Sequence, residues 1–180
     1  MVNEDLVRKF KAKAAEAGAE VETFADAAGA IEFIVRFMAN QHPAKVVAAP
    51  DALEFVPRDA DFDLLEPASM IGYAPAEAGL VRADKGVAAT GTLVHWDKGE
   101  EDRIVWTLPP VCLCVLKEDA VVAELDDIAG FMAEHLAPVE APSFAQVSLV
   151  TGPSRTADIE GELSLGVHGP GRLIILLLRS

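Results

Sequence analysis

Two glycine-containing segments, far apart in the sequence, hold the residues that could bind a small ligand. The first is Thr90-Gly91-Thr92, and the second begins at Gly152, directly after an apolar run. Glycine permits a sharp turn and a close approach of the backbone, while hydroxyl and guanidinium groups supply hydrogen-bond donors. The candidate ligand-binding residues are therefore Thr90, Gly91, Thr92, Gly152, Ser154, Arg155, Thr156 and Gly169.

The polar residues of the second segment also have purely structural interpretations. Ser154 and Thr156 could cap a helix, and Arg155 could form a surface ion pair. A guanidinium also binds a carboxylate through two parallel hydrogen bonds. Arg155 is thus a candidate for holding a small carboxylate ligand.

His168 and Asp158 are the candidate catalytic residues. His168 is flanked by glycine-rich sequence, and an imidazole exchanges protons near neutral pH. We expect a helix to begin near Pro153, which would place Asp158 on the same face as Ser154, four residues earlier. Because an apolar strand precedes this turn, these groups should lie at its carboxyl end, where ligands bind in open α/β sheets.

The cysteine content speaks against a metal or redox cofactor in this chain. The sequence contains two cysteines, Cys112 and Cys114, whereas an iron–sulfur cluster is held by four ligands. The two cysteines alternate with apolar residues in a predicted strand. We therefore expect buried, unreactive thiols and no metal site.

The order of apolar and amphipathic segments predicts an α/β fold. A helix capped by Asn3 presents Leu6, Phe10 and Ala14 on one face, and strand and helix patterns alternate after it. A second helix should begin at Asp26, and a third should carry Val122, Leu125, Ala129, Met132 and Leu136. The predicted strands cover residues 21–24, 45–49, 87–94, 104–106, 111–116, 146–151 and 173–178.

The segment between residues 87 and 106 reads as a β-hairpin around a polar turn. Residues 97–102 would form the turn, between the strands at 87–94 and 104–106. His95, Trp96 and Asp97 run into this charged turn. We therefore expect these three side chains to be solvated.

Length and charge restrict the class of protein and its partners. A chain of 180 residues suits one domain, and 15 basic against 29 acidic residues give a net charge of −14. That charge repels nucleic acids and anionic membranes. No apolar run approaches the roughly 20 residues of a membrane helix, and the N-terminus lacks the charge pattern of a secretion signal. We expect a single cytoplasmic domain over residues 1–180, for which homo-oligomerisation is compatible with the sequence.

The residues from Val150 to Glu160, followed by Leu165 to Pro170, resemble the LUD domain, and within it the lactate-utilisation protein C (LutC/YkgG) family. Residues 88–94 and Leu108-Pro109-Pro110 match the family in the expected order. The motifs lie in residues 80–180, and the match over residues 1–75 is weaker. The resemblance implies a three-layer α/β/α sandwich related to the NagB/RpiA/CoA-transferase fold, with the β-hairpin as an excursion.

The resemblance also implies a role in a multi-protein, iron–sulfur-dependent system that oxidises L-lactate to pyruvate. In such a system this chain would lack its own redox centre, and cysteine-rich partner subunits would hold the iron–sulfur clusters. The family more often has an acidic residue before Thr-Gly-Thr, where this chain has Ala89. That difference argues against glutamate-dependent acyl transfer. Two alternatives stay open: a stand-alone small-molecule enzyme of the CoA-transferase-like fold, and a non-catalytic scaffold or regulator of the lactate system.

Overall fold

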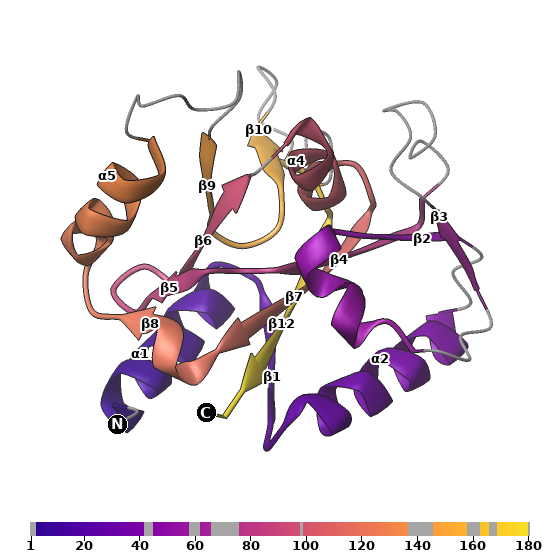
Figure 1. Ribbon diagram of the computed structural model, residues 1–180, viewed down its shortest axis with the longest axis horizontal. Helices are drawn as coiled ribbons and strands as arrows, with labels where there is room; N and C mark the ends of the chain where they lie inside the picture. The colour runs from indigo at the N-terminus through magenta and orange to yellow at the C-terminus, as the bar shows by residue number, and fades with distance from the viewer. Residues whose placement is uncertain are drawn as a thin grey trace.

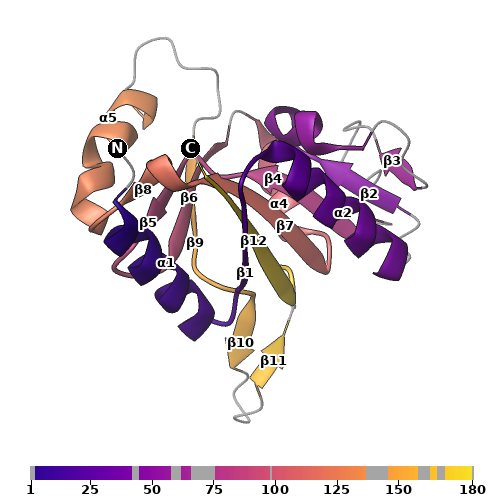
Figure 2. The same ribbon diagram turned by 90° about the horizontal axis from the view of Figure 1, so that it is seen from below.

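A six-stranded parallel sheet forms the centre of the molecule (Figures 1 and 2). The computed structural model describes residues 3–41, 45–57, 62–65, 76–97, 99–136, 146–157, 163–165 and 169–179. The strands, in spatial order, are β1 (Glu20–Phe24), β12 (Arg172–Leu178), β7 (Val111–Lys117), β4 (Ala78–Arg82), β2 (Lys45–Ala48) and β3 (Asp63–Leu65). All five pairings are parallel. The neighbouring interior strands β12 and β7 are almost wholly apolar, as expected for a sheet that is covered on both faces.

A smaller four-stranded sheet lies beside the large one. Its order is β8 (Val121–Val122), β5 (Lys85–Val87), β6 (Thr92–Asp97) and β9 (Gln146–Val150). Strands β5 and β6 are an antiparallel hairpin joined through residues 88–91, and β9 pairs antiparallel to β6. A separate two-stranded ribbon consists of β10 (Arg155–Ala157) and β11 (Leu163–Leu165).

Helices cover the large sheet and fill the angle between the two sheets. The α-helices are α1 (Glu4–Glu16), α2 (Ala27–Gln41), α4 (Glu100–Thr107) and α5 (Ala129–Leu136), and the short 3₁₀ helices are η1 (Pro50–Phe55), η2 (Glu118–Ala120) and η3 (Leu125–Ile128). Helix α2 packs on β1 and β12, whereas α4 packs on β4, and Figure 1 shows α2 and α4 on opposite sides of the sheet. This arrangement confirms the α/β prediction. Among the described residues, no helix is both long enough and apolar enough to cross a membrane.

Helix α1 connects the two sheets. Its Asn3 cap accepts hydrogen bonds from the backbone N–H groups of Asp5 and Leu6, as the sequence predicts. The helix packs on β1 of the large sheet and on β8 of the small sheet. Its Phe10 is completely buried and lies against Gly86 of β5, where a side chain would collide with the ring. Deep burial of one aromatic ring thus fixes the position of the helix between the sheets.

Three sequence predictions are wrong. The segment containing Ile104–Trp106 is helix α4 instead of a strand, so the observed hairpin is β5–β6. The segment after Pro153 is strand β10 instead of a helix, because it pairs with β11. Val122 belongs to strand β8, and the helix expected there begins later, at Ala129, after the 3₁₀ turn η3. A short apolar pattern such as Ile104–Trp106 is compatible with either structure, and the residues after Pro153 have no apolar pattern that favours a helix.

Candidate functional site

The two glycine-containing segments meet in space. Strand β6 begins at Thr92 and β9 ends at Val150, and their antiparallel pairing brings Thr92 beside Thr151. The Thr92 hydroxyl oxygen lies 2.7 Å from that of Thr90 and 2.7 Å from that of Thr151. Three hydroxyl groups therefore form a continuous hydrogen-bonded chain between the segments.

Both glycine turns are packed against the C-terminal end of α1. Gly91 and Gly152 have positive φ angles of 70° and 72°, a conformation that side chains rarely adopt. A Cβ atom on Gly91 would overlap the backbone of Ala14, and one on Gly152 would overlap the carbonyl group of Ala17. The close approach that these glycines permit is thus an approach to the helix, in contrast to the ligand contact expected from the sequence.

A hollow of about 510 Å³ lies next to the second glycine segment. It is lined by Thr151, Gly152, Ser154, Arg155, Gly169 and Trp106, among others. The Ser154 N–H donates a hydrogen bond of 2.8 Å to the Pro170 carbonyl, which holds the two walls together. The Arg155 guanidinium lies over Gly18, whose missing side chain leaves room for it.

The structure brings some of the predicted residues to this hollow and leaves others apart. Gly152, Ser154, Arg155 and Gly169 line it. Thr90 and Thr92 are connected to it only through Thr151, and Gly91 is covered by α1. Thr156 takes part in β10 through its backbone, opposite Ser164. Asp158 and His168 lie outside the described residues.

The hollow lies at the carboxyl end of β9, the strand before Gly152, and this place coincides with the amino ends of the parallel strands of the large sheet. Pro170 precedes β12, Ala17 precedes β1 and Thr107 precedes β7, and all three residues line the hollow. The hollow is not at the carboxyl edge of the parallel sheet, because β9 belongs to the small antiparallel sheet. The usual ligand-binding edge of the large sheet is therefore at its opposite end.

A buried polar cluster occupies that other end, and the sequence reading missed it. The side chains of His95 and Asp97 are 1% and 0% exposed, so the expectation that both are solvated is wrong. His95 Nδ1 lies 3.4 Å from Asp84 Oδ2, and His95 Nε2 lies 3.9 Å from Asp97 Oδ1. The Ser148 hydroxyl donates a hydrogen bond to Asp97. The sequence signal for this cluster was the two-residue separation of His95 and Asp97, which places both side chains on one face of a strand.

The electrostatic environment of this cluster favours a protonated histidine. Burial lowers the pKa of His95, but the carboxylates of Asp84, Asp51 and Asp97 outweigh burial and raise it above its ordinary value. Burial raises the pKa of Asp97, partly offset by the hydrogen bond from Ser148 and by His95. The cluster thus brings together an imidazole and a carboxyl group whose pKa values are both raised.

This cluster lies at the point in the large sheet where the order in which successive strands are added changes direction. From β2 the chain continues outward to β3, and it then returns through β4, on the other side of β2, to β7. Asp84 follows the carboxyl end of β4, and Asp51 follows that of β2. Such a switch point is where ligands commonly bind in open α/β sheets.

The two cysteines are inert, as the sequence predicts. Cys112 and Cys114 are both fully buried in β7. Burial raises the pKa of the Cys112 thiol to about 12 and that of Cys114 well above its ordinary value. Both thiols are therefore protonated at neutral pH, and in the described part of the chain no three metal-binding side chains come together.

Comparison with known proteins identifies a family. The model of the LUD domain matches residues 71–178. An uncharacterized protein of Neisseria meningitidis is 36% identical over 102 residues, which are 57% of this chain and 42% of that protein. Lactate utilization protein C of Geobacillus thermodenitrificans is 31% identical over 53% of this chain and 39% of its own length. The match thus spans about two fifths of these relatives.

One solved structure has the same fold. The crystal structure of a DUF162 family protein from Deinococcus radiodurans superposes with a TM-score of 0.71, and the match covers 97% of each chain. The sequence identity is 20%. This likeness shows the fold.

Proposed function

Because the chain belongs to the LUD domain family, we propose that it takes part in lactate utilisation. Relatives named lactate utilization protein C, from Geobacillus thermodenitrificans and Bacillus subtilis, support this role. More specifically, the chain would be a component of a cytoplasmic, multi-protein, iron–sulfur-dependent system that oxidises L-lactate to pyruvate. It would contribute no redox centre of its own.

The thiol chemistry of the chain supports this division of labour. Two cysteines are too few for an iron–sulfur cluster, and both are buried as protonated thiols. The two electrons released when lactate becomes pyruvate would therefore pass to clusters in cysteine-rich partner subunits.

The hollow beside Ser154 supports a carboxylate-binding role and is the observation on which this assignment rests. The Arg155 guanidinium and the hydroxyl groups of Thr151 and Ser154 supply donors for a carboxylate, while Trp106 supplies an apolar wall. Gly169, which lines the hollow, is the residue after His168. We therefore keep His168, with Asp158, as the proposed acid–base residues.

Growth on L-lactate tests the role in the cell. We expect that deletion of the gene in the organism that encodes this chain abolishes growth on L-lactate and leaves growth on glucose unchanged. Reintroduced wild-type chain should restore growth, whereas Arg155→Gln should reduce the growth rate several-fold, because it removes the cation from the hollow. Arg36→Gln, an exposed arginine on α2, is the matched control and should restore growth fully.

Several outcomes would contradict the proposal. Normal growth of the deletion strain on L-lactate would overturn the role itself. Full restoration by Arg155→Gln would overturn the carboxylate-binding hollow and favour a scaffold. The tagged chain, purified from lactate-grown cells, should bring down partners that contain iron and acid-labile sulfide. Turnover of small-molecule substrates by the isolated chain would favour a stand-alone enzyme instead.

A further inference from the structure

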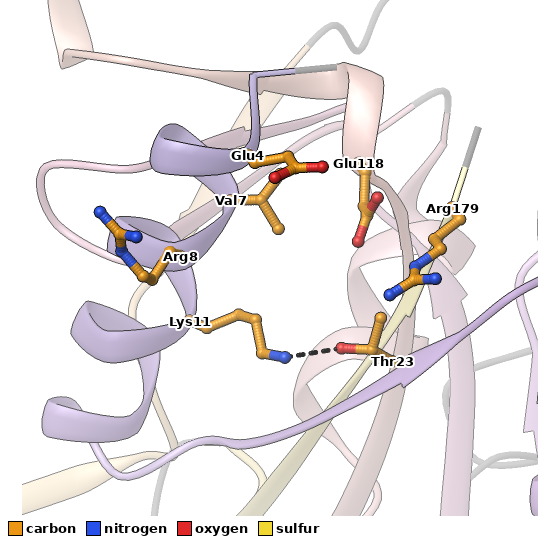
Figure 3. Close-up of a pocket in the computed structure, with 7 residues that line it drawn as sticks. All are labelled: Glu4, Val7, Arg8, Lys11, Thr23, Glu118 and Arg179. Carbon is orange, nitrogen blue, oxygen red and sulfur yellow. Dashed lines mark hydrogen bonds between the residues drawn. The ribbon is translucent and has the colours of Figure 1, made fainter.

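A second hollow, of about 540 Å³, lies at the carboxyl ends of the parallel strands, at the opposite end of the large sheet from Ser154 (Figure 3). Its walls come from four separate elements. The lining residues are Glu4, Val7, Arg8 and Lys11 of α1, Thr23 of β1, Glu118 of η2 after β7, and Arg179 after β12. Strands β1, β12 and β7 are neighbours, so their ends form one continuous edge. Ligands of open α/β sheets bind at this edge.

Two cations and a hydroxyl group face this hollow. The Lys11 ammonium donates a hydrogen bond of 2.8 Å to the Thr23 hydroxyl oxygen, which leaves two ammonium N–H groups and the Thr23 O–H able to donate to a ligand. Figure 3 shows the Arg179 guanidinium directed into the same space from the opposite wall. Within the described residues, neither Lys11 nor Arg179 forms an ion pair with a carboxylate.

The pairing of charges elsewhere makes this arrangement informative. The chain carries 29 acidic and 15 basic residues, so acidic partners are plentiful. Other basic residues use them: Arg8 pairs with Asp5, Lys9 with Glu124 and Arg172 with Glu20. Two cations that converge on one concave surface without such partners are positioned to bind an anion.

The opposite side of the hollow restricts the class of anion. The carboxylates of Glu4 and Glu118 lie across the space from Lys11 (Figure 3). They would repel a dianion such as hydrogen phosphate, and they accept hydrogen bonds from a hydroxyl or ammonium group. Buried Val7 supplies an apolar contact between the two polar sides.

We propose that this hollow is a binding site for a small monocarboxylate that also carries a hydrogen-bond donor, a hydroxy acid or an amino acid. The carboxylate would lie between Lys11, Thr23 and Arg179, and the donor would face Glu118 and Glu4. This site is separate from the hollow beside Ser154. Its test is a binding measurement, so its failure and the failure of the lactate role are distinguishable.

The experiment is a ¹H–¹⁵N NMR titration of the full chain with sodium L-lactate, L-alanine, sodium pyruvate and inorganic phosphate at constant ionic strength. We expect saturable amide shifts at Lys11, Thr23 and Arg179 with L-lactate or L-alanine. Pyruvate lacks the donor and should bind more weakly, and phosphate should produce no saturable shift there. Lys11→Gln and Arg179→Gln should each weaken binding at least about tenfold, because each loses a charge-assisted hydrogen bond.

Lys13 provides the matched control on the same helix. It is not among the residues that line the hollow, and its ammonium pairs with Glu16 at 2.6 Å. Lys13→Gln removes the same charge from α1 and should bind these ligands as the wild type does. Absence of saturable shifts with both L-lactate and L-alanine would overturn the site. Equal binding of phosphate, or equal losses of affinity for Lys13→Gln and Lys11→Gln, would show a non-specific attraction of anions and would also overturn the site.

Discussion

The burial of His95 beside two carboxylates makes the stability of the protein depend on pH. The carboxylates of Asp84, Asp51 and Asp97 outweigh burial and raise the pKa of His95, so the folded chain binds this proton more tightly than the unfolded chain. The stabilisation is fully present below the ordinary pKa of about 6.5 and is lost as the pH rises through the raised value. Asp97 adds to the same trend at lower pH, because its pKa is also raised in the folded state.

We predict that the free energy of unfolding falls between pH 6 and pH 9 and that His95→Gln reduces this fall. Glutamine cannot take up the proton that the folded state holds. Urea unfolding curves at several pH values measure both effects. Val35→Gln, which introduces a glutamine at an exposed position of α2, is the control and should retain the wild-type dependence on pH. The same dependence on pH in His95→Gln and the wild type would contradict the charge assignment of the cluster.

At the scale of the element, the two glycine turns allow helix α1 to pack closely against them. Each turn has a positive φ angle, and each places its missing side chain against the backbone of the helix. The Gly91 turn joins β5 and β6 of the small sheet, and the Gly152 turn follows β9 of the same sheet, whereas α1 also packs on β1 of the large sheet. The glycines therefore hold the two sheets at a fixed distance through the helix.

We predict that Gly91→Ala destabilises the protein by about 2 kcal/mol or more. The change adds a side chain in the left-handed region and forces α1 away from the turn. Thermal or urea unfolding measures the loss. Gly130→Ala is the control, because a Cβ there meets no atom within 4 Å and alanine is favoured in a helix. Unchanged stability of Gly91→Ala would show that the packing against α1 contributes little.

The sequence predicted the elements whose pattern is long or fully apolar. Helix α1 with its Asn3 cap, and strands β7 and β12, were predicted because local periodicity and caps determine them. Helix α4 was not predicted, since the three apolar residues Ile104–Trp106 fit either structure. Strand β10 was not predicted, since the short segment Arg155–Ala157 has no strand pattern of its own and is a strand through its pairing with β11. The position of the hollow depends on which sheet β9 joins, and no local pattern carries that information.

At the scale of the whole molecule, the excess of negative charge opposes the compact state. The net charge of −14 on 180 residues means that like-charged side chains repel each other, and this repulsion is stronger in the compact folded chain, where they lie closer together. Salt screens charges that lie more than about 10 Å apart at 0.1 M. The folded state should therefore gain stability from salt, even though surface ion pairs such as Arg8–Asp5 weaken.

We predict that 0.3 M sodium chloride raises the melting temperature at pH 7. Relief of about 1 kcal/mol of repulsion corresponds to about 2–4 °C for a chain of this size. Differential scanning calorimetry at low and high salt measures the change. The same comparison near the isoelectric point, at about pH 4.6, is the control and should show a smaller rise. A melting temperature that falls with salt at pH 7 would mean that attractive ion pairs dominate.

The place of β12 has a consequence for synthesis on the ribosome. Strand β1 is at the edge of the large sheet, and its neighbour is β12, which ends at Leu178. About 150 residues are translated between the two strands, which at 5–20 residues per second takes roughly 8–30 seconds. During that time the nascent chain exposes the unpaired edge of β1, and from the synthesis of β7 onward also that of β7, the kind of edge that invites aggregation. The large sheet is complete only when the last strand of the chain has left the ribosome.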